Sequence, residues 1–125
     1  MRYLTARKRA EGKGASGSGT EHFWFMQTTA VGLAILMPWV VVMLGRAIRS
    51  DYGNAWYILM NPWVSIPLAL ALFVGTRHFA AGARVMIEDY TRGTWRKGLI
   101  ITVTSLSYLI TAIGLYALAV ITLKG

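Results

Sequence analysis

The sequence predicts an all-α integral membrane protein with three transmembrane helices. Of its 125 residues, 55% are hydrophobic and only 14% are charged, and the mean hydropathy is +0.48. A soluble domain of this size keeps a large surface and covers it with charged side chains. The composition therefore argues against a soluble enzyme and against a disordered chain. The absence of cysteine argues against a disulfide-rich miniprotein, thiol catalysis and cysteine-ligated zinc or iron–sulfur clusters.

The chain divides into a tail and one membrane domain. Residues 1–20 are polar and basic, and glycine and serine dominate positions 12–19. Because such sequences behave as flexible coils, we expect a flexible basic tail. Residues 21–125 are expected to form a single transmembrane domain of three helices.

Apolar stretches define the three helices, which are predicted at about 22–46, 62–88 and 98–123. Phe23–Leu44 contains 22 uncharged residues, about 33 Å of helix, which is enough for a hydrocarbon core of about 30 Å. The last stretch, Leu99–Leu123, is also uncharged. The middle helix is expected to begin at about Asn61 or Ser65: Asn61–Pro62 suits an N-cap residue followed by proline at the first helical position, whereas Pro67 could mark a later start or a kink. Residues 45–60 and 88–98 are expected to be connections, the first with interfacial aromatic side chains.

The distribution of lysine and arginine predicts the orientation. Nine of these residues lie in the tail, at the end of the second helix or in the second connection, and three lie on the opposite side. Positively charged segments stay on the cytoplasmic side, so the N-terminus is predicted to be cytoplasmic, or in the matrix for a mitochondrial protein. The expected location is the bacterial inner membrane or the mitochondrial inner membrane. Topology and anionic lipids account for the net charge of +8 without nucleic acid.

Small and hydroxylated residues recur at helical spacing in two of the predicted helices. The third helix carries such a stripe at Thr104, Ser107, Thr111 and Gly114, and the first helix offers Thr28 and Gly32. Small residues let membrane helices approach closely, and hydroxyl groups bond across them. These residues are therefore expected to pack the bundle.

His78 is the most informative residue of the second helix. It lies about 15 Å from the nearer end of that helix, close to the bilayer midplane, where an ionisable group is costly and usually functional. Ala71, Gly75 and Gly82 lie within about 60° of it on the helical wheel, so a flat prosthetic group could approach this face. Neutral imidazole is a good axial ligand for haem iron. The residues alone leave open whether His78 binds haem or is a packed histidine bonded to a neighbouring helix.

A second axial histidine would have to come from another subunit. His22 is the only other histidine in the chain, and it lies about 15 Å away in depth. Arg77 and Arg84 share a face of the same helix, and the deeper Arg77 would need an anion, which a haem propionate or a partner carboxylate could supply, or a water-filled cavity. Snorkelling of both arginines to the head groups is the alternative.

Glu88, Asp89 and Tyr90 end the second helix. A phenol donor beside carboxylates could bind a quinone carbonyl and handle its protons. The triplet is weak evidence by itself, because tyrosine and acidic residues at a helix end commonly mark the membrane interface.

Together these motifs resemble the hydrophobic membrane anchor (D) subunit of succinate dehydrogenase, respiratory complex II, of the alphaproteobacterial type. The resemblance rests on the segments Gly19–Trp24 and Thr28–Val31, on His78 followed by Gly82, and on Glu88-Asp89-Tyr90 with Tyr90 twelve residues after His78. It extends over residues 1–125 in layout, and the His…Asp-Tyr spacing is its most specific part.

The resemblance implies a two-subunit anchor bundle, three helices from this chain and three from the cytochrome b (C) subunit, that docks the iron–sulfur and flavoprotein subunits. It further implies that His78 is an axial ligand of haem b, that Tyr90 hydrogen-bonds ubiquinone, and that Asp89 lines the quinone pocket. Gly82 would make room for the haem. Some members have an arginine near the haem propionates where this chain has Gln27, and Arg77 is the candidate replacement.

The function implied by the resemblance is that of a membrane anchor of succinate:ubiquinone oxidoreductase, with no dehydrogenase chemistry in this chain alone. Three alternatives remain at this point. The chain could anchor a fumarate reductase, it could be a small channel or transporter subunit in which Arg77 and His78 line an ion path, or it could be a structural assembly factor.

Overall fold

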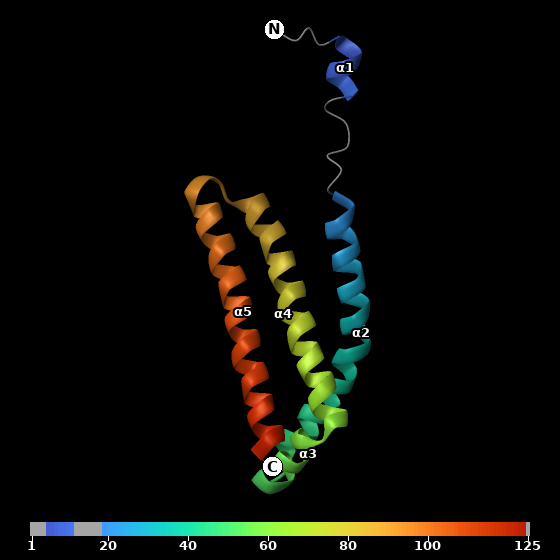
Figure 1. Cartoon of the computed structure of the whole chain (residues 1–125), viewed down its shortest axis with the longest axis vertical. Helices are drawn as coiled ribbons and strands as arrows, with labels where there is room; N and C mark the ends of the chain where they lie inside the picture. The colour runs from blue at the N-terminus through green and yellow to red at the C-terminus, as the bar shows by residue number, and fades with distance from the viewer. Residues whose placement is uncertain (1–4, 12–18, 125) are drawn as a thin grey trace.

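Three long helices form a bundle in the computed structural model, which describes residues 5–11 and 19–124 (Figure 1). They are α2 (Gly19–Arg49), α4 (Pro62–Tyr90) and α5 (Gly93–Lys124), and each is long and apolar enough to cross a membrane. Two short helices, α1 (Ala6–Glu11) and α3 (Tyr52–Met60), complete the described part of the chain, which contains no strand. The predicted three-helix membrane architecture is confirmed.

The helices extend further than the apolar stretches suggested. The segment 45–60, expected to be a simple connection, continues α2 to Arg49 and then forms α3. The polar segment 88–98 is mostly helical, so only Thr91 and Arg92 separate α4 from α5. Polar residues are compatible with helix outside the hydrocarbon core, and hydropathy therefore marks the buried part of a span rather than its ends. In the tail, α1 is helical, while 12–18 lie outside the described residues.

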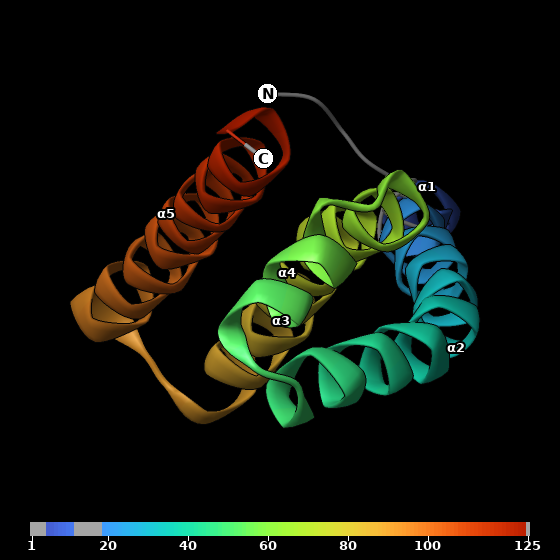
Figure 2. The same ribbon diagram turned by 90° about the horizontal axis from the view of Figure 1, so that it is seen from below.

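α4 is the central element of the bundle. α2 and α5 each pack against α4, and they make no contact with one another within the described part of the chain. Figures 1 and 2 show α4 between its two neighbours, with α3 at the end remote from the α4–α5 turn. α2 bends along its length, as Figure 2 shows, and Pro38 lies inside it, where proline removes a backbone hydrogen bond and kinks the helix.

Side-chain caps fix the short connections at the α3 end. Asn61 ends α3 and its side chain accepts a hydrogen bond from the Trp63 backbone N–H at 3.0 Å, which confirms the earlier of the two starts predicted for the second span; Pro67 lies inside α4. Asp51 caps α3 by accepting from Asn54 through the backbone and the side chain. The side-chain bond to Asn54 has the largest effect on the pKa of the Asp51 carboxyl, and the backbone bond follows. Both hold this pKa below its usual value because they stabilise the charged form.

The α4–α5 interface uses the small-residue stripe of α5. Ser107 and Thr111 are buried, and the hydroxyl oxygens of Thr76 and Thr111 lie 2.7 Å apart across the interface. Gly114 lies directly against the Leu72 side chain. The packing role predicted for this stripe is confirmed.

The packing prediction for the first span was wrong at both of its residues. Thr28 is exposed, and a Cβ added at Gly32 would meet nothing within 4 Å. The adjacent Thr29 makes the polar contact with α4 instead.

We expect Gly114→Ala to destabilise the bundle, because the added Cβ would overlap the Cδ2 methyl group of Leu72 and force that side chain to shift. Overpacking of this kind costs about 1–3 kcal/mol. The matched control is Gly98→Ala in the same helix, where nothing lies within 4 Å of the added atom. Thermal unfolding of the purified complex should show a lower Tm for Gly114→Ala than for Gly98→Ala, and equal values would contradict the close α4–α5 contact.

Candidate functional site

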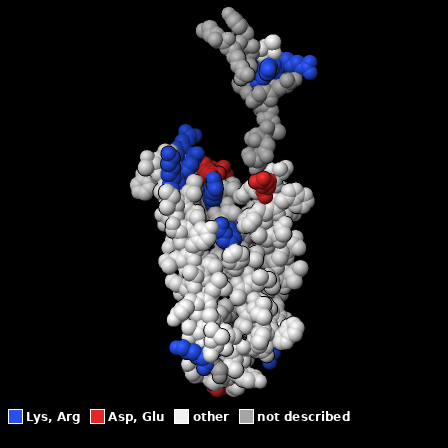
Figure 3. Space-filling model, in the orientation of Figure 1, with Lys and Arg blue, Asp and Glu red and all other residues white. Residues whose placement is uncertain are grey.

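A polar groove opens over α4, between α2 and α5. It encloses about 540 Å³, and its polar lining comes from all three helices. The polar residues are His22, Arg77, Arg84, Glu88 and Thr104. Figure 3 shows charged side chains gathered at the two ends of the molecule, except for basic ones that lie part-way down the face toward the viewer. The groove therefore places positively charged side chains on a face of the bundle that is otherwise apolar.

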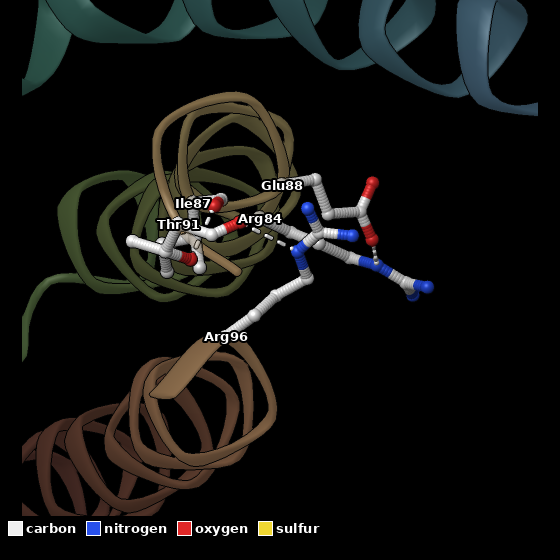
Figure 4. A network of polar contacts seen from close by, with 5 residues as sticks. All are labelled: Arg84, Ile87, Glu88, Thr91 and Arg96. Atoms are coloured by element: carbon white, nitrogen blue, oxygen red, sulfur yellow. Dashed lines mark hydrogen bonds and ion pairs between the residues drawn. The ribbon is translucent and has the colours of Figure 1, made fainter. Parts of the chain in front are cut away.

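The two arginines of this groove differ in their partners. Arg84 Nε donates to Glu88 Oε1 at 2.9 Å, one helical turn away, and both side chains are largely exposed (Figure 4). Arg77 places its guanidinium over the Tyr108 ring, 4.4 Å from the centroid, an attractive cation–π contact. Its Nη1 is buried and has no hydrogen-bond partner among the described residues. Because an unsatisfied buried donor is costly, Arg77 is a candidate for binding an anion from outside this chain.

His78 lies between α4 and α2 and is half-buried. Its Nδ1 is 2.7 Å from Thr29 Oγ1, a contact that joins the two helices. No hydrogen bond engages Nε2 within the described part of the chain. His78 does not belong to the residues that line the groove, although its neighbour Arg77 does.

The face around His78 packs against α2. Ala71 is buried, while Cβ atoms added at Gly75 and Gly82 would stand 3.7 Å from Leu33 Cδ2 and Met26 Cε respectively. Side chains of α2 thus occupy the space that the sequence left for a flat group. Both are flexible, and 3.7 Å is ordinary van der Waals separation.

Asp89 and Tyr90 lie at the end of α4, outside the groove. Both are exposed, with Tyr90 at 86%. The turn that follows is held by Thr91 Oγ1, which donates to the Ile87 carbonyl at 2.6 Å, and by Arg96 Nε, which donates to the Thr91 carbonyl at 2.8 Å (Figure 4). The Tyr90 phenol therefore projects from an anchored helix end.

Gly93 makes the short turn possible. Its φ is +65°, in the left-handed region that glycine adopts without strain. α5 begins at this residue and runs back along α4.

The structure brings only some of the predicted residues together. Arg77 shares the groove with Arg84, whereas His78 contacts α2, and Asp89 and Tyr90 lie outside the groove at the end of α4. Within the described residues, no group of three or more His, Cys, Asp or Glu side chains could hold a metal ion.

Sequence reasoning missed two partners of the candidate site. They are Thr29, bonded to His78, and Tyr108, beneath Arg77. Tyr108 follows Thr104 by four residues and so shares the face of the small-residue stripe. This spacing could have indicated that Tyr108 faces α4. No local pattern connects Thr29 with His78.

Comparison with known proteins gives a consistent result. Residues 1–123 match the model of the succinate dehydrogenase/fumarate reductase transmembrane subunit family. The chain is 39% identical over 119 residues to the succinate dehydrogenase hydrophobic membrane anchor subunit of Paracoccus denitrificans, covering 95% of this chain and 92% of the relative. Anchor subunits of Rickettsia bellii and Rickettsia felis are 30% and 24% identical, over 81% and 82% of this chain and 82% and 86% of their own lengths. No solved structure matches the chain significantly.

These similarities agree with the fold. Three apolar helices and bacterial anchor-subunit relatives make the chain a multi-pass protein of the inner membrane. A match over 1–123 covers all three spans. The chain therefore belongs to the succinate dehydrogenase/fumarate reductase transmembrane subunit family, among the hydrophobic membrane anchor subunits of succinate dehydrogenase.

Proposed function

We propose that this chain anchors a succinate:ubiquinone oxidoreductase, shares haem b with a cytochrome b (C) subunit, and contributes to the ubiquinone site. The observation that carries the proposal is the state of His78. His78 lies in the middle of the apolar helix α4, its Nδ1 contacts Thr29 of α2, and its Nε2 has no hydrogen-bond partner among the described residues. An imidazole held in this way suits an axial metal ligand.

The residues present fit a haem in two respects. Nε2 of His78 is available as one ligand nitrogen, and Arg77 Nη1 is a buried donor with no acceptor in the part of the chain that the structure describes. A propionate carboxylate would supply that acceptor and compensate the charge, so Arg77 would take the part that Gln27 leaves vacant. Gly82 has no side chain and so leaves room on α4 beside His78. The Met26 side chain, which lies next to Gly82, would have to move to admit the haem there. The haem would supply a one-electron redox centre at this depth.

The second axial ligand belongs to the partner subunit in this proposal. His22 lies in the first turn of α2, exposed, and His78 lies in the interior of α4. One ligand from each subunit would make the haem itself part of the contact between them.

The quinone site is proposed at the α4–α5 corner. Tyr90 offers an exposed phenol donor and Asp89 an adjacent carboxylate. The phenol would hydrogen-bond a quinone carbonyl, and the carboxylate would help to move protons toward it. Exposure of both side chains suits a pocket that is completed by other subunits.

This end of the bundle is proposed to face the cytoplasm and to receive the iron–sulfur and flavoprotein subunits. It carries Arg92, Arg96 and Lys97 and the start of α2, so the positive-inside preference favours this orientation. Electrons would then arrive close to Tyr90 from clusters in a soluble subunit.

Gentle detergent extraction of the tagged chain from its own membrane, followed by mass spectrometry, tests the proposal. We expect a flavoprotein, an iron–sulfur protein and a second small three-helix protein to co-purify, with succinate-dependent quinone reduction by the preparation. Fumarate reduction without succinate oxidation would favour the reverse-direction enzyme. Recovery of this chain alone as a homo-oligomer would overturn the proposal and support a channel or transporter.

A further inference from the structure

Thr29 and His78 form a polar contact across the α2–α4 interface. The Thr29 Oγ1–His78 Nδ1 distance is 2.7 Å, and both residues are half-buried. Two neighbouring contact points of the helices flank this contact: a Cβ added at Gly82 would stand 3.7 Å from Met26 Cε, and one added at Gly75 would stand 3.7 Å from Leu33 Cδ2.

Counting protons assigns the direction of this hydrogen bond. Thr29 Oγ1 also lies 2.7 Å from the Phe25 carbonyl oxygen and 3.1 Å from that of Met26. Carbonyl oxygens only accept, and a threonine hydroxyl has one proton to donate. All the contacts are satisfied together only when the hydroxyl donates to its own helix and accepts from His78 Nδ1–H.

This direction determines the chemistry of the other ring nitrogen. A neutral imidazole protonated at Nδ1 carries its free lone pair on Nε2, the form that binds a metal through Nε2. The hydrogen bond also restrains the direction in which Nδ1 points, because the Thr29 hydroxyl is itself held by the carbonyls of its own helix.

We propose that Thr29 is the positioning residue of the haem ligand, selecting the Nδ1–H tautomer of His78 and aiming Nε2 at the iron. The inference rests on the proposed role of His78. Thr29 touches neither iron nor substrate and acts only through the imidazole. A hydrogen bond accepted from Nδ1–H makes the ligand more basic, which favours ferric over ferrous haem.

Thr29→Val in the assembled four-subunit complex is the direct test. Valine keeps the β-branched shape and removes the acceptor, so we expect haem retention to weaken by about 10–100-fold. The midpoint potential of the retained haem should become more positive, and its low-spin electron paramagnetic resonance signal should shift. Thr29→Ser keeps the hydroxyl and should retain native values. Thr28→Val is the matched control, because Thr28 is exposed and adjacent.

The outcomes separate this inference from the proposal on which it rests. Native potential and spectrum in an assembled Thr29→Val complex would overturn the role of Thr29 and leave His78 as ligand. An unchanged haem signal in His78→Ala would overturn the ligand assignment itself. Equal shifts in Thr29→Ser and Thr29→Val would also count against the hydroxyl, since only one of them loses it.

A measurement on the native complex covers the case in which Thr29→Val does not assemble. Electron–nuclear double resonance of the ferric haem should detect a hydrogen-bonded, exchangeable Nδ1–H proton on one axial imidazole in complex labelled with ¹⁵N-histidine in this subunit alone. A labelled imidazole bound through Nδ1, or one without that proton, would overturn the proposal.

Discussion

Replacing His78 by alanine is expected to abolish the b-type haem signal of the assembled complex or to reduce it by about tenfold or more. The methyl group offers no lone pair, and losing even an outer-shell partner of a metal ligand commonly costs 10–100-fold in affinity. The other histidine, His22, is exposed in the first turn of α2 and cannot take over at this position. Reduced-minus-oxidised spectra and pyridine haemochrome content of the purified complex give the result.

The matched control for this experiment is His22→Ala, which should keep the full haem signal. Subunit composition must be measured on the same samples, because a bundle that lacks its haem could also lose a subunit. A complete complex of His78→Ala with native haem content and spectrum would contradict the ligand assignment.

Replacing Tyr90 by phenylalanine is expected to slow quinone reduction by roughly tenfold or more while sparing electron transfer from succinate to a soluble dye. The change removes one hydroxyl donor and leaves the ring, and a lost hydrogen bond of about 1.4 kcal/mol corresponds to a factor of ten. Because Tyr90 is exposed on this chain, the fold should tolerate the change. The two activities should be assayed on one preparation.

Tyr116→Phe provides the control for the loss of a phenol. Tyr116 is also strongly exposed, at 72%, and lies in α5. It should leave both activities at native level. Parallel loss of dye and quinone activities in Tyr90→Phe would indicate failed assembly, and native quinone activity would remove Tyr90 from the proposed site.

The transmembrane fold could be predicted because its main determinants are local. Long uncharged stretches specify spans, and Asn61 with Pro62 specifies where α4 begins. The small-residue stripe of α5 also indicated its contact face, since spacing within one helix is enough to define a face. The helical ends beyond the apolar stretches and the helix α3 were missed, because hydropathy carries no information about helix outside lipid.

The candidate site was less predictable because its contacts join different helices. Sequence identified His78 and Arg77 as unusual in an apolar helix, but their neighbours Thr29 and Tyr108 lie 49 and 31 positions away along the chain. Packing on α2 depends on which of two adjacent threonines, Thr28 or Thr29, faces α4. Adjacent residues of a helix point about 100° apart, and a bend such as the one at Pro38 can change which of them faces the neighbouring helix. Only the folded bundle selects Thr29.

The lack of contact between α2 and α5 bears on how the cell controls the amount of this subunit. With α4 as their only common neighbour among the long helices, the described parts of α2 and α5 leave the groove beside Arg77 open on one side. An arginine at the centre of a membrane helix costs about 2.5–3.5 kcal/mol on insertion scales. A copy made in excess of its partner thus keeps a half-buried arginine beside an open polar groove within the bilayer, and we expect membrane proteases to remove it while assembled copies survive.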